Sequence, residues 1–170
     1  MRAAYALIAL SVMLAITALM LPVLAQDRAA TGQLALLAPQ AAGALSPLDR
    51  IKAGEINCPG CDLSGADLSH QCVKEGDLRG ANFDRVTAHY MCMSYANFAG
   101  ATFRGADLTG VNLSHSDLSG ADLSGAKLDI ALLKGADLSA AKGLTQAQLD
   151  TACSDADTKL PEGFTPRTCL

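Results

Sequence analysis

Apolar side chains recur every five residues from Cys61 to Ala140, over sixteen consecutive pentads without a gap. The third residue of a pentad is apolar in all sixteen and is Leu or Phe in thirteen. The first residue is small or Val in fourteen, the second is usually Asp or Asn, and the fifth is Gly in eight. This period matches neither the 3.6 residues of a helical turn nor the two-residue alternation of a strand.

Two inward positions in each pentad, the first and the third, fit a short extended side followed by a corner. Glycine at the fifth position supplies backbone that turns easily with positive φ. One unit alone buries almost no apolar surface, whereas stacked units bury a continuous column. The pattern therefore predicts an all-β solenoid over residues 61–140.

The repeated letters also carry a family resemblance. Residues 121–125 read Ala-Asp-Leu-Ser-Gly, with near copies at 66–70 and 106–110. This sequence resembles the motif of the pentapeptide-repeat proteins, and the resemblance extends over all sixteen pentads. It implies a right-handed quadrilateral β-helix with one pentad on each side, so that the block makes about four coils.

A coil of four pentads stacks residues that are 20 apart in sequence. Side chains of like kind then form inward columns, and the acids and amides at the second position form outward columns. We expect these acids to serve turns and solvation, because a regular exposed ladder offers no desolvated carboxylate for acid–base catalysis. The two principal core columns are Leu63, Phe83, Phe103 and Leu123, and Leu78, Phe98, Leu118 and Leu138.

The N-terminal segment indicates export. Residues 1–25 contain Arg2, a long apolar run and small residues before the predicted cleavage point after Ala25, as in a secretory signal peptide. The alternative is an uncleaved anchor, since the apolar run is just long enough to span a bilayer. Residues 26–45 are predicted to be a flexible linker. We therefore expect a periplasmic or secreted protein without membrane contact after cleavage.

Both ends of the repeat block carry helix signals. Residues 46–60 form the expected N-terminal cap, in which a Ser-Pro pair predicts a helix over about 47–53. Residues 141–170 form the expected C-terminal cap, in which Thr145 and Gln148 make a capping box that opens a helix to about residue 152. The last coil is expected to be covered by Leu144 and Leu149.

All six cysteines follow residue 57. In an exported chain an even number of cysteines favours disulfides. The middle pair occupies second positions 20 residues apart, which places the Cα atoms on adjacent coils at about 4.8 Å, within the range of a disulfide. Redox catalysis by the first pair lacks the helix N-terminus that stabilises a thiolate. The expected pairs are Cys58–Cys61, Cys72–Cys92 and Cys153–Cys169.

One stretch, residues 70–95, departs from the repeat and carries most of the unusual side chains. Three interpretations stay open: drift of the repeat with a disulfide, a protein-binding patch, because exposed aromatics anchor interfaces, and a soft-metal site using His89, Cys72 and Cys92. The candidate interaction edge comprises His70, Glu75, His89, Tyr90, Tyr95 and His115.

The net charge of -4 argues against nucleic acid as a partner, because phosphate binding needs clustered Lys and Arg. The leading hypothesis is a non-enzymatic exported scaffold, without cofactor or catalytic residue, that binds a protein or envelope component. The resemblance adds an alternative, since some acidic family members mimic DNA and bind DNA gyrase. A signal peptide and a repeat block with 10 acids against 6 bases weaken it. A soft-metal-binding or thiol-active periplasmic protein is the third hypothesis.

Overall fold

The computed structural model describes residues 45–55 and 57–169. The expected signal peptide, residues 1–25, and residues 26–44 of the expected linker lie outside this part of the chain. Among the described residues, no helix has the length and hydrophobicity that crossing a bilayer requires.

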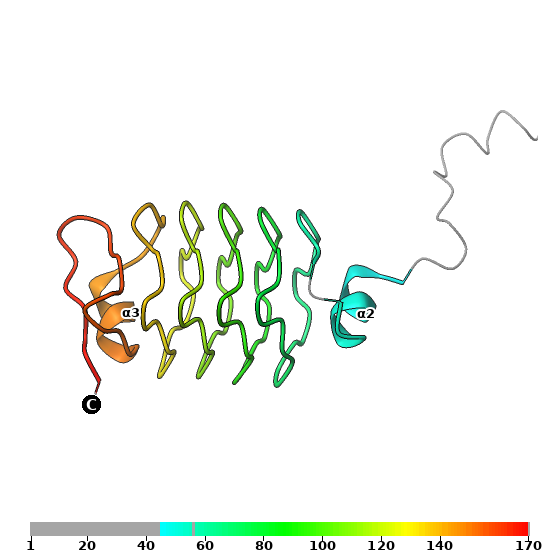
Figure 1. The fold of residues 1–170 in the computed structure, drawn as a ribbon, viewed down its shortest axis with the longest axis horizontal. Coiled ribbons are helices and arrows are strands. Elements are labelled where there is room, and N and C mark those ends of the chain that lie inside the picture. Colours follow the sequence, from blue (N-terminus) through cyan, green and yellow to red (C-terminus); the bar gives the residue numbers. More distant parts are fainter. Residues whose placement is uncertain (1–44, 56, 170) are drawn as a thin grey trace, which may run out of the picture. The chain divides into compact units, whose positions relative to one another are not determined.

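Residues 57–143 wind into stacked four-sided coils, which Figure 1 shows side by side along one axis. Parallel bridges join second-position residues that are 20 apart, from Asp62 paired with Asn82 to Asp122 paired with Lys142. Backbone hydrogen bonds of 2.8 and 2.9 Å flank such a bridge, as between Asn82 N and Cys61 O and between Leu63 N and Asn82 O. Four pentads therefore complete one coil.

The interior is filled by first- and third-position side chains. The rings of Phe83 and Phe103 stack with centroids 4.9 Å apart, and Phe98 meets them edge-on at 5.7 and 5.6 Å. Both geometries are favourable for aromatic pairs. The fully buried column residues are Leu63, Phe83, Phe103 and Leu123 in one column, and Leu78, Phe98, Leu118 and Leu138 in the other.

Outward acids and amides at the second position fasten the corners. Their side-chain oxygen accepts a hydrogen bond from the N–H two residues later, at 2.9 Å from Ser119 N to Asp117 and at 3.0 Å from Ala99 N to Asn97. This local bond is the turn chemistry that Asp and Asn favour. It accounts for most of these acids without a catalytic role.

The ladder begins before the expected start of the repeats. Cys58 N donates to Asp77 O at 2.8 Å, and Asp77 N donates to Asn57 Oδ1 at 2.9 Å. The N-terminal helix α2 (Pro47–Lys52) precedes it, with Ser46 as N-cap and a buried Ile51. Its Ser46 Oγ accepts from Asp49 N at 3.1 Å, which satisfies one of the free N–H groups of the first turn.

The ladder also continues beyond residue 140. Helix α3 (Gln146–Thr151) starts at a capping box on Thr145 and interrupts the coil. Pairing then resumes between Leu132 and Cys153 and between Asp137 and Lys159, so the offset grows from 20 to 21 and then 22 residues. The chain therefore builds an incomplete further coil that contains a helix.

Helix α3 is held against the last regular coil by buried and hydrogen-bonded side chains. Leu144 and Leu149 are 8% and 1% exposed and belong to the core. The Gln148 amide donates to the carbonyl oxygens of Leu123 and Ala126 at 3.0 and 2.8 Å. The open carbonyls of that coil corner are thereby satisfied by a side chain.

Candidate interaction surface

The structure bonds four of the cysteines in two pairs. Cys58 is bonded to Cys61 across the Pro-Gly corner that leads into the first coil, and Cys153 is bonded to Cys169 near the end of the chain. In both pairs the Cα atoms are 5.5 Å apart, within the usual range for disulfides.

The expected bridge between Cys72 and Cys92 is absent, and both residues are free thiols. The two residues are directly paired on adjacent coils, as the 20-residue map predicts. Neighbouring parallel strands in register point their Cβ atoms the same way, about 4.8 Å apart. A disulfide needs a Cβ–Cβ distance of about 3.5 to 4.5 Å. Strands paired at this ordinary spacing satisfy the Cα criterion for a disulfide but not the Cβ criterion.

The irregular corners have an unusual backbone. Among the residues that the structure describes, seven other than glycine have positive φ, and all of them stand at the fifth position of a pentad. The left-handed conformation costs a residue with a Cβ about 1–2 kcal/mol. These residues are His70, Glu75, Arg85, Tyr90, Tyr95, His115 and Ile130.

Four of these corner residues form two stacked ring pairs. The rings of His70 and Tyr90, here named the first ridge, lie 5.9 Å apart at an interplanar angle of 10°. The rings of Tyr95 and His115, the second ridge, lie 4.8 Å apart at 20°. The tyrosines remain 59% and 55% exposed. Two aromatic ridges therefore stand at the two edges of one side of the coils.

Glycine in the next coil allows each ridge to lie flat. A Cβ at Gly110 would lie 2.6 Å from the Tyr90 ring, and a Cβ at Gly135 would lie 2.5 Å from His115 Nδ1. Both glycines have positive φ as well, so two features favour glycine there. The Tyr90 ring therefore packs against the backbone of Gly110, and the His115 ring against that of Gly135.

Glu75 is one of the two expected edge residues that do not stack, and His89 is the other. The Glu75 carboxylate lies 3.8 Å from Lys74 Nζ, which in turn lies 5.6 Å from the centre of the Tyr95 ring. A cation over an exposed ring contributes about 0.5–1 kcal/mol. Lys74 and Glu75 thus place a charged pair beside the rings of the second ridge.

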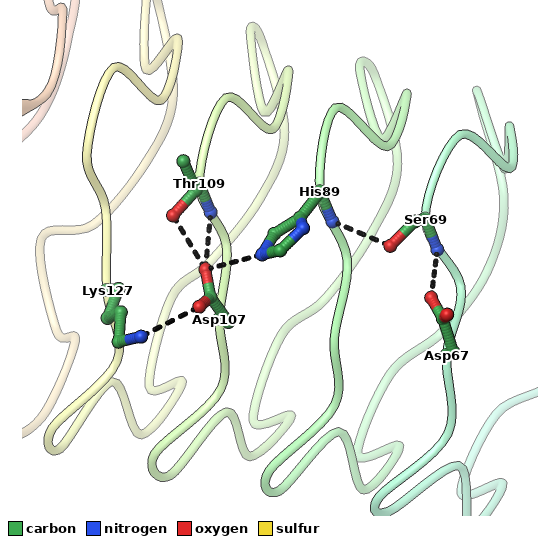
Figure 2. Close-up of polar contacts among 6 residues, drawn as sticks. All are labelled: Asp67, Ser69, His89, Asp107, Thr109 and Lys127. Carbon is green, nitrogen blue, oxygen red and sulfur yellow. Dashed lines mark hydrogen bonds and ion pairs between the residues drawn. The ribbon is translucent and has the colours of Figure 1, made fainter.

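The side of the coils next to the first ridge carries a polar cluster centred on Asp107, shown in Figure 2. Its carboxylate accepts hydrogen bonds at 2.8 Å from Lys127 Nζ and at 2.6 Å from Thr109 Oγ1, and its Oδ1 lies 3.1 Å from His89 Nε2. These donors, Lys127 foremost, hold the pKa of Asp107 far below its usual value. We name these four residues the Asp107 cluster.

The position of His89 argues against the soft-metal interpretation that groups it with Cys72 and Cys92. Its imidazole contacts Asp107, and no group of three or more His, Cys, Asp or Glu side chains within residues 45–55 and 57–169 could hold a metal ion. The Asp107 cluster was missed in the sequence, although Lys127 follows Asp107 by one coil and both stand at the second position.

The serine beside His89 does not complete a hydrolytic triad. Ser69 Oγ accepts from the backbone N of His89 at 3.3 Å, and Ser69 N donates to Asp67 at 3.0 Å (Figure 2). A nucleophile must instead present its hydroxyl to the imidazole. The contacts of Ser69 therefore serve the turn.

Comparison with known proteins identifies the family of the repeat. The sequence model of the family described as Pentapeptide repeats (8 copies) matches residues 61–94, 96–135 and 116–152. None of the curated protein sequences matches the chain. A pentapeptide repeat protein of Nostoc Pcc 7120 is 25% identical, with a TM-score of 0.37 over 69% of this chain and 84% of that one.

Two further solved structures are similar. QnrB1, a plasmid-mediated fluoroquinolone resistance protein, is 21% identical, with a TM-score of 0.41 over 58% of this chain and 62% of its own. A pentapeptide repeat protein from the Arabidopsis thaliana thylakoid lumen is 31% identical, with a TM-score of 0.29 over 54% of this chain and 63% of its own.

Proposed function

The chain belongs to the pentapeptide-repeat family, whose fold is a right-handed quadrilateral β-helix, and we propose that it is a non-enzymatic exported scaffold that binds a protein partner. The binding surface in this proposal is the side of the coils between the two ridges. It includes the second-position thiols Cys72 and Cys92 and the rings at its two edges.

The conformation of the ridge residues is the observation that supports this proposal. Stability alone favours glycine at these corners, because left-handed backbone costs each of the four ring residues about 1–2 kcal/mol. Stacking returns about 0.5–1.5 kcal/mol for each pair. The rings therefore lower stability on balance and leave Tyr90 and Tyr95 exposed. Exposed tyrosines are common anchors of protein interfaces, which explains their presence better than folding does.

Export is the second element of the proposal. The supporting observations are the signal-like residues 1–25 and the cysteine pairs Cys58–Cys61 and Cys153–Cys169, a type of bond that persists in oxidising compartments. Fractionation of cells that express the full chain, with N-terminal sequencing of the product, tests this. We expect a product outside the cytoplasm that begins at Gln26. A full-length cytoplasmic product would contradict export.

The gyrase alternative receives little support from the charges. Several second-position acids contact a cation, as Asp122 does with Arg104 Nε at 2.8 Å and Asp137 with Lys159 Nζ at 2.9 Å. A surface that mimics DNA needs unneutralised negative charge, because a partner reads the field of the phosphates. Local pairing therefore makes these columns poor substitutes for a phosphate backbone.

Partner capture with matched variants tests the binding surface. Tyr90→Gly/Tyr95→Gly removes both exposed rings and relieves the left-handed strain, so the variant should fold at least as well as wild type. Ile130→Gly is the control, because Ile130 is also an exposed corner residue with positive φ but carries no ring and lies two coils beyond Tyr90 on the same corner.

Envelope fractions are passed over the immobilised wild type and the two variants. We expect a protein retained by the wild type and by the Ile130 variant to be lost from the tyrosine double variant. If the same protein stays on all three, the ridges are not the interface. A circular dichroism spectrum and melting curve for each variant distinguish this outcome from misfolding.

A further inference from the structure

The side of the coils between the ridges holds a thiol pair with no structural role in the fold. Cys72 and Cys92 are bridged through their backbones, with 2.9 Å hydrogen bonds from Val73 N to Cys92 O and from Cys92 N to Gln71 O. The neighbouring third-position residues, Val73 and Met93, are buried, so both thiols lie on the outer side. Cys72 is exposed and Cys92 partly buried.

We propose that Cys72 and Cys92 bind one monovalent copper ion between them as a two-thiolate site. This inference is independent of the proposed protein partner. It uses a ligand set different from the one that groups His89 with the thiols, since His89 belongs to the Asp107 cluster.

The spacing of the coils fits this site better than it fits a disulfide. With the Zn–S bond of about 2.3 Å as an upper guide to the shorter Cu(I)–thiolate bond, an ion midway between two thiolates separates the sulfur atoms by at most about 4.6 Å. Neighbouring strands are about 4.7–4.9 Å apart, so the two side chains can stay parallel. Thiolates are the soft ligands that select Cu(I). A sulfur–sulfur bond would require both side chains to converge by more than 2 Å.

Cys92 is partly buried beside the Cys72 residue of the adjacent coil, and these surroundings favour the protonated form of the Cys92 thiol. Burial is the main cause that raises the pKa of the Cys92 thiol, and the adjacent Cys72 thiol raises it further. Hydrogen bonds from Ser94 act in the opposite direction and favour the thiolate. Ser94 can stabilise the thiolate that a cation creates at Cys92.

Binding breaks two S–H bonds and forms two Cu–S bonds, and both protons leave to the solvent. No electron is transferred, so the site needs no oxidant or reductant once the ion is supplied as Cu(I). The complex carries one negative charge on an outer side of the coils. Uptake should consequently weaken as the pH falls and protons compete with the metal.

Anaerobic titration with Cu(I) buffered by a chromogenic chelator tests the proposal on the full chain with its two disulfides intact. We expect one copper ion per chain, and native mass spectrometry should show the loss of two protons. Cys72→Ser/Cys92→Ser should lose this uptake. The control Cys58→Ser/Cys61→Ser should retain it, because that pair lies at the first corner.

Alkylation provides a readout that needs no variant. Iodoacetamide should label Cys72 and Cys92 in the metal-free chain and neither residue after Cu(I) is added, as peptide mass spectrometry can map. Equal labelling with and without copper would overturn the site. So would uptake by the Cys72/Cys92 double variant at the wild-type level, or a Cys72–Cys92 disulfide in protein taken from its native compartment.

Discussion

Alanine at Gly110 should destabilise the protein more than alanine at Gly120, although both glycines have a φ of +69°. The left-handed backbone costs a residue with a Cβ about 1–2 kcal/mol, which applies to both sites. A Cβ at Gly120 would meet open space, so no further loss is expected there. At Gly110 the new methyl would lie 2.6 Å from the Tyr90 ring.

Tyr90 must therefore move in the Gly110 variant and leave its stack with His70. Loss of that ring pair adds about 0.5–1.5 kcal/mol. We expect the free energy of unfolding to fall by about 1–2 kcal/mol for Gly120→Ala and by about 1.5–3.5 kcal/mol for Gly110→Ala. Urea unfolding followed by circular dichroism measures both, provided that the m-values agree.

A double-mutant cycle isolates the ring contact. In a Tyr90→Ala background the two glycine variants should lose equal amounts of stability, because the clash no longer exists. Equal losses with Tyr90 present would refute the seating of the first ridge on Gly110. A stabilising effect of either alanine would refute the left-handed backbone at that corner.

Three other predictions concern the core, one ion pair and one disulfide. Phe83→Ala should lower the free energy of unfolding by about 3–5 kcal/mol. Phe83→Leu should lower it by less than half as much, because leucines occupy both ends of the same column. Equal losses would contradict the packing of Phe83 in that column. The Ser139 hydroxyl and then Lys159 lower the pKa of Asp137 to about 2, so its contribution is complete above about pH 4 and is lost as the pH falls through 2. Asp137→Asn should therefore cost about 1 kcal/mol at pH 7 in urea unfolding, after allowance for solvent screening, and nothing below pH 2. Cys153→Ser/Cys169→Ser opens a loop with a sequence separation of 16 and should lower the free energy of unfolding by about 3 kcal/mol in non-reducing urea titrations. Loss of the Cys58–Cys61 pair, with its separation of 3, should cost less. The reverse order would contradict the loop-entropy account.

The repeat could be predicted from the sequence in detail because its period is an integer. A five-residue side and a four-sided coil assign each residue to a column without any knowledge of side-chain conformation, and Phe83 stacks on Phe103 as that map requires. The same map brought His70 to Tyr90 and Tyr95 to His115. Periodicity alone was sufficient for these contacts.

Features that depend on side-chain direction or on an insertion could not be predicted in the same way. Cys72 and Cys92 are paired on adjacent coils as the map requires, yet both are free thiols, which the ordinary spacing of parallel strands explains. His89 turns toward Asp107 on its own side of the coil, a choice of rotamer that no column map contains. Beyond residue 140 the helix α3 breaks the integer period, so the later pairing of Asp137 with Lys159 was hidden.

The shift in pairing offset after α3 has a consequence for self-association. A stack of identical coils exposes free backbone groups at its last turn, and another chain could extend it indefinitely as a fibre. Here the last turn no longer repeats every 20 residues, and Ser154 is already paired with Thr168 of the returning tail. A second molecule that docked there would find neither the right spacing nor vacant hydrogen-bonding groups at this pair. The irregular ending should therefore hinder end-to-end stacking of chains through backbone hydrogen bonds.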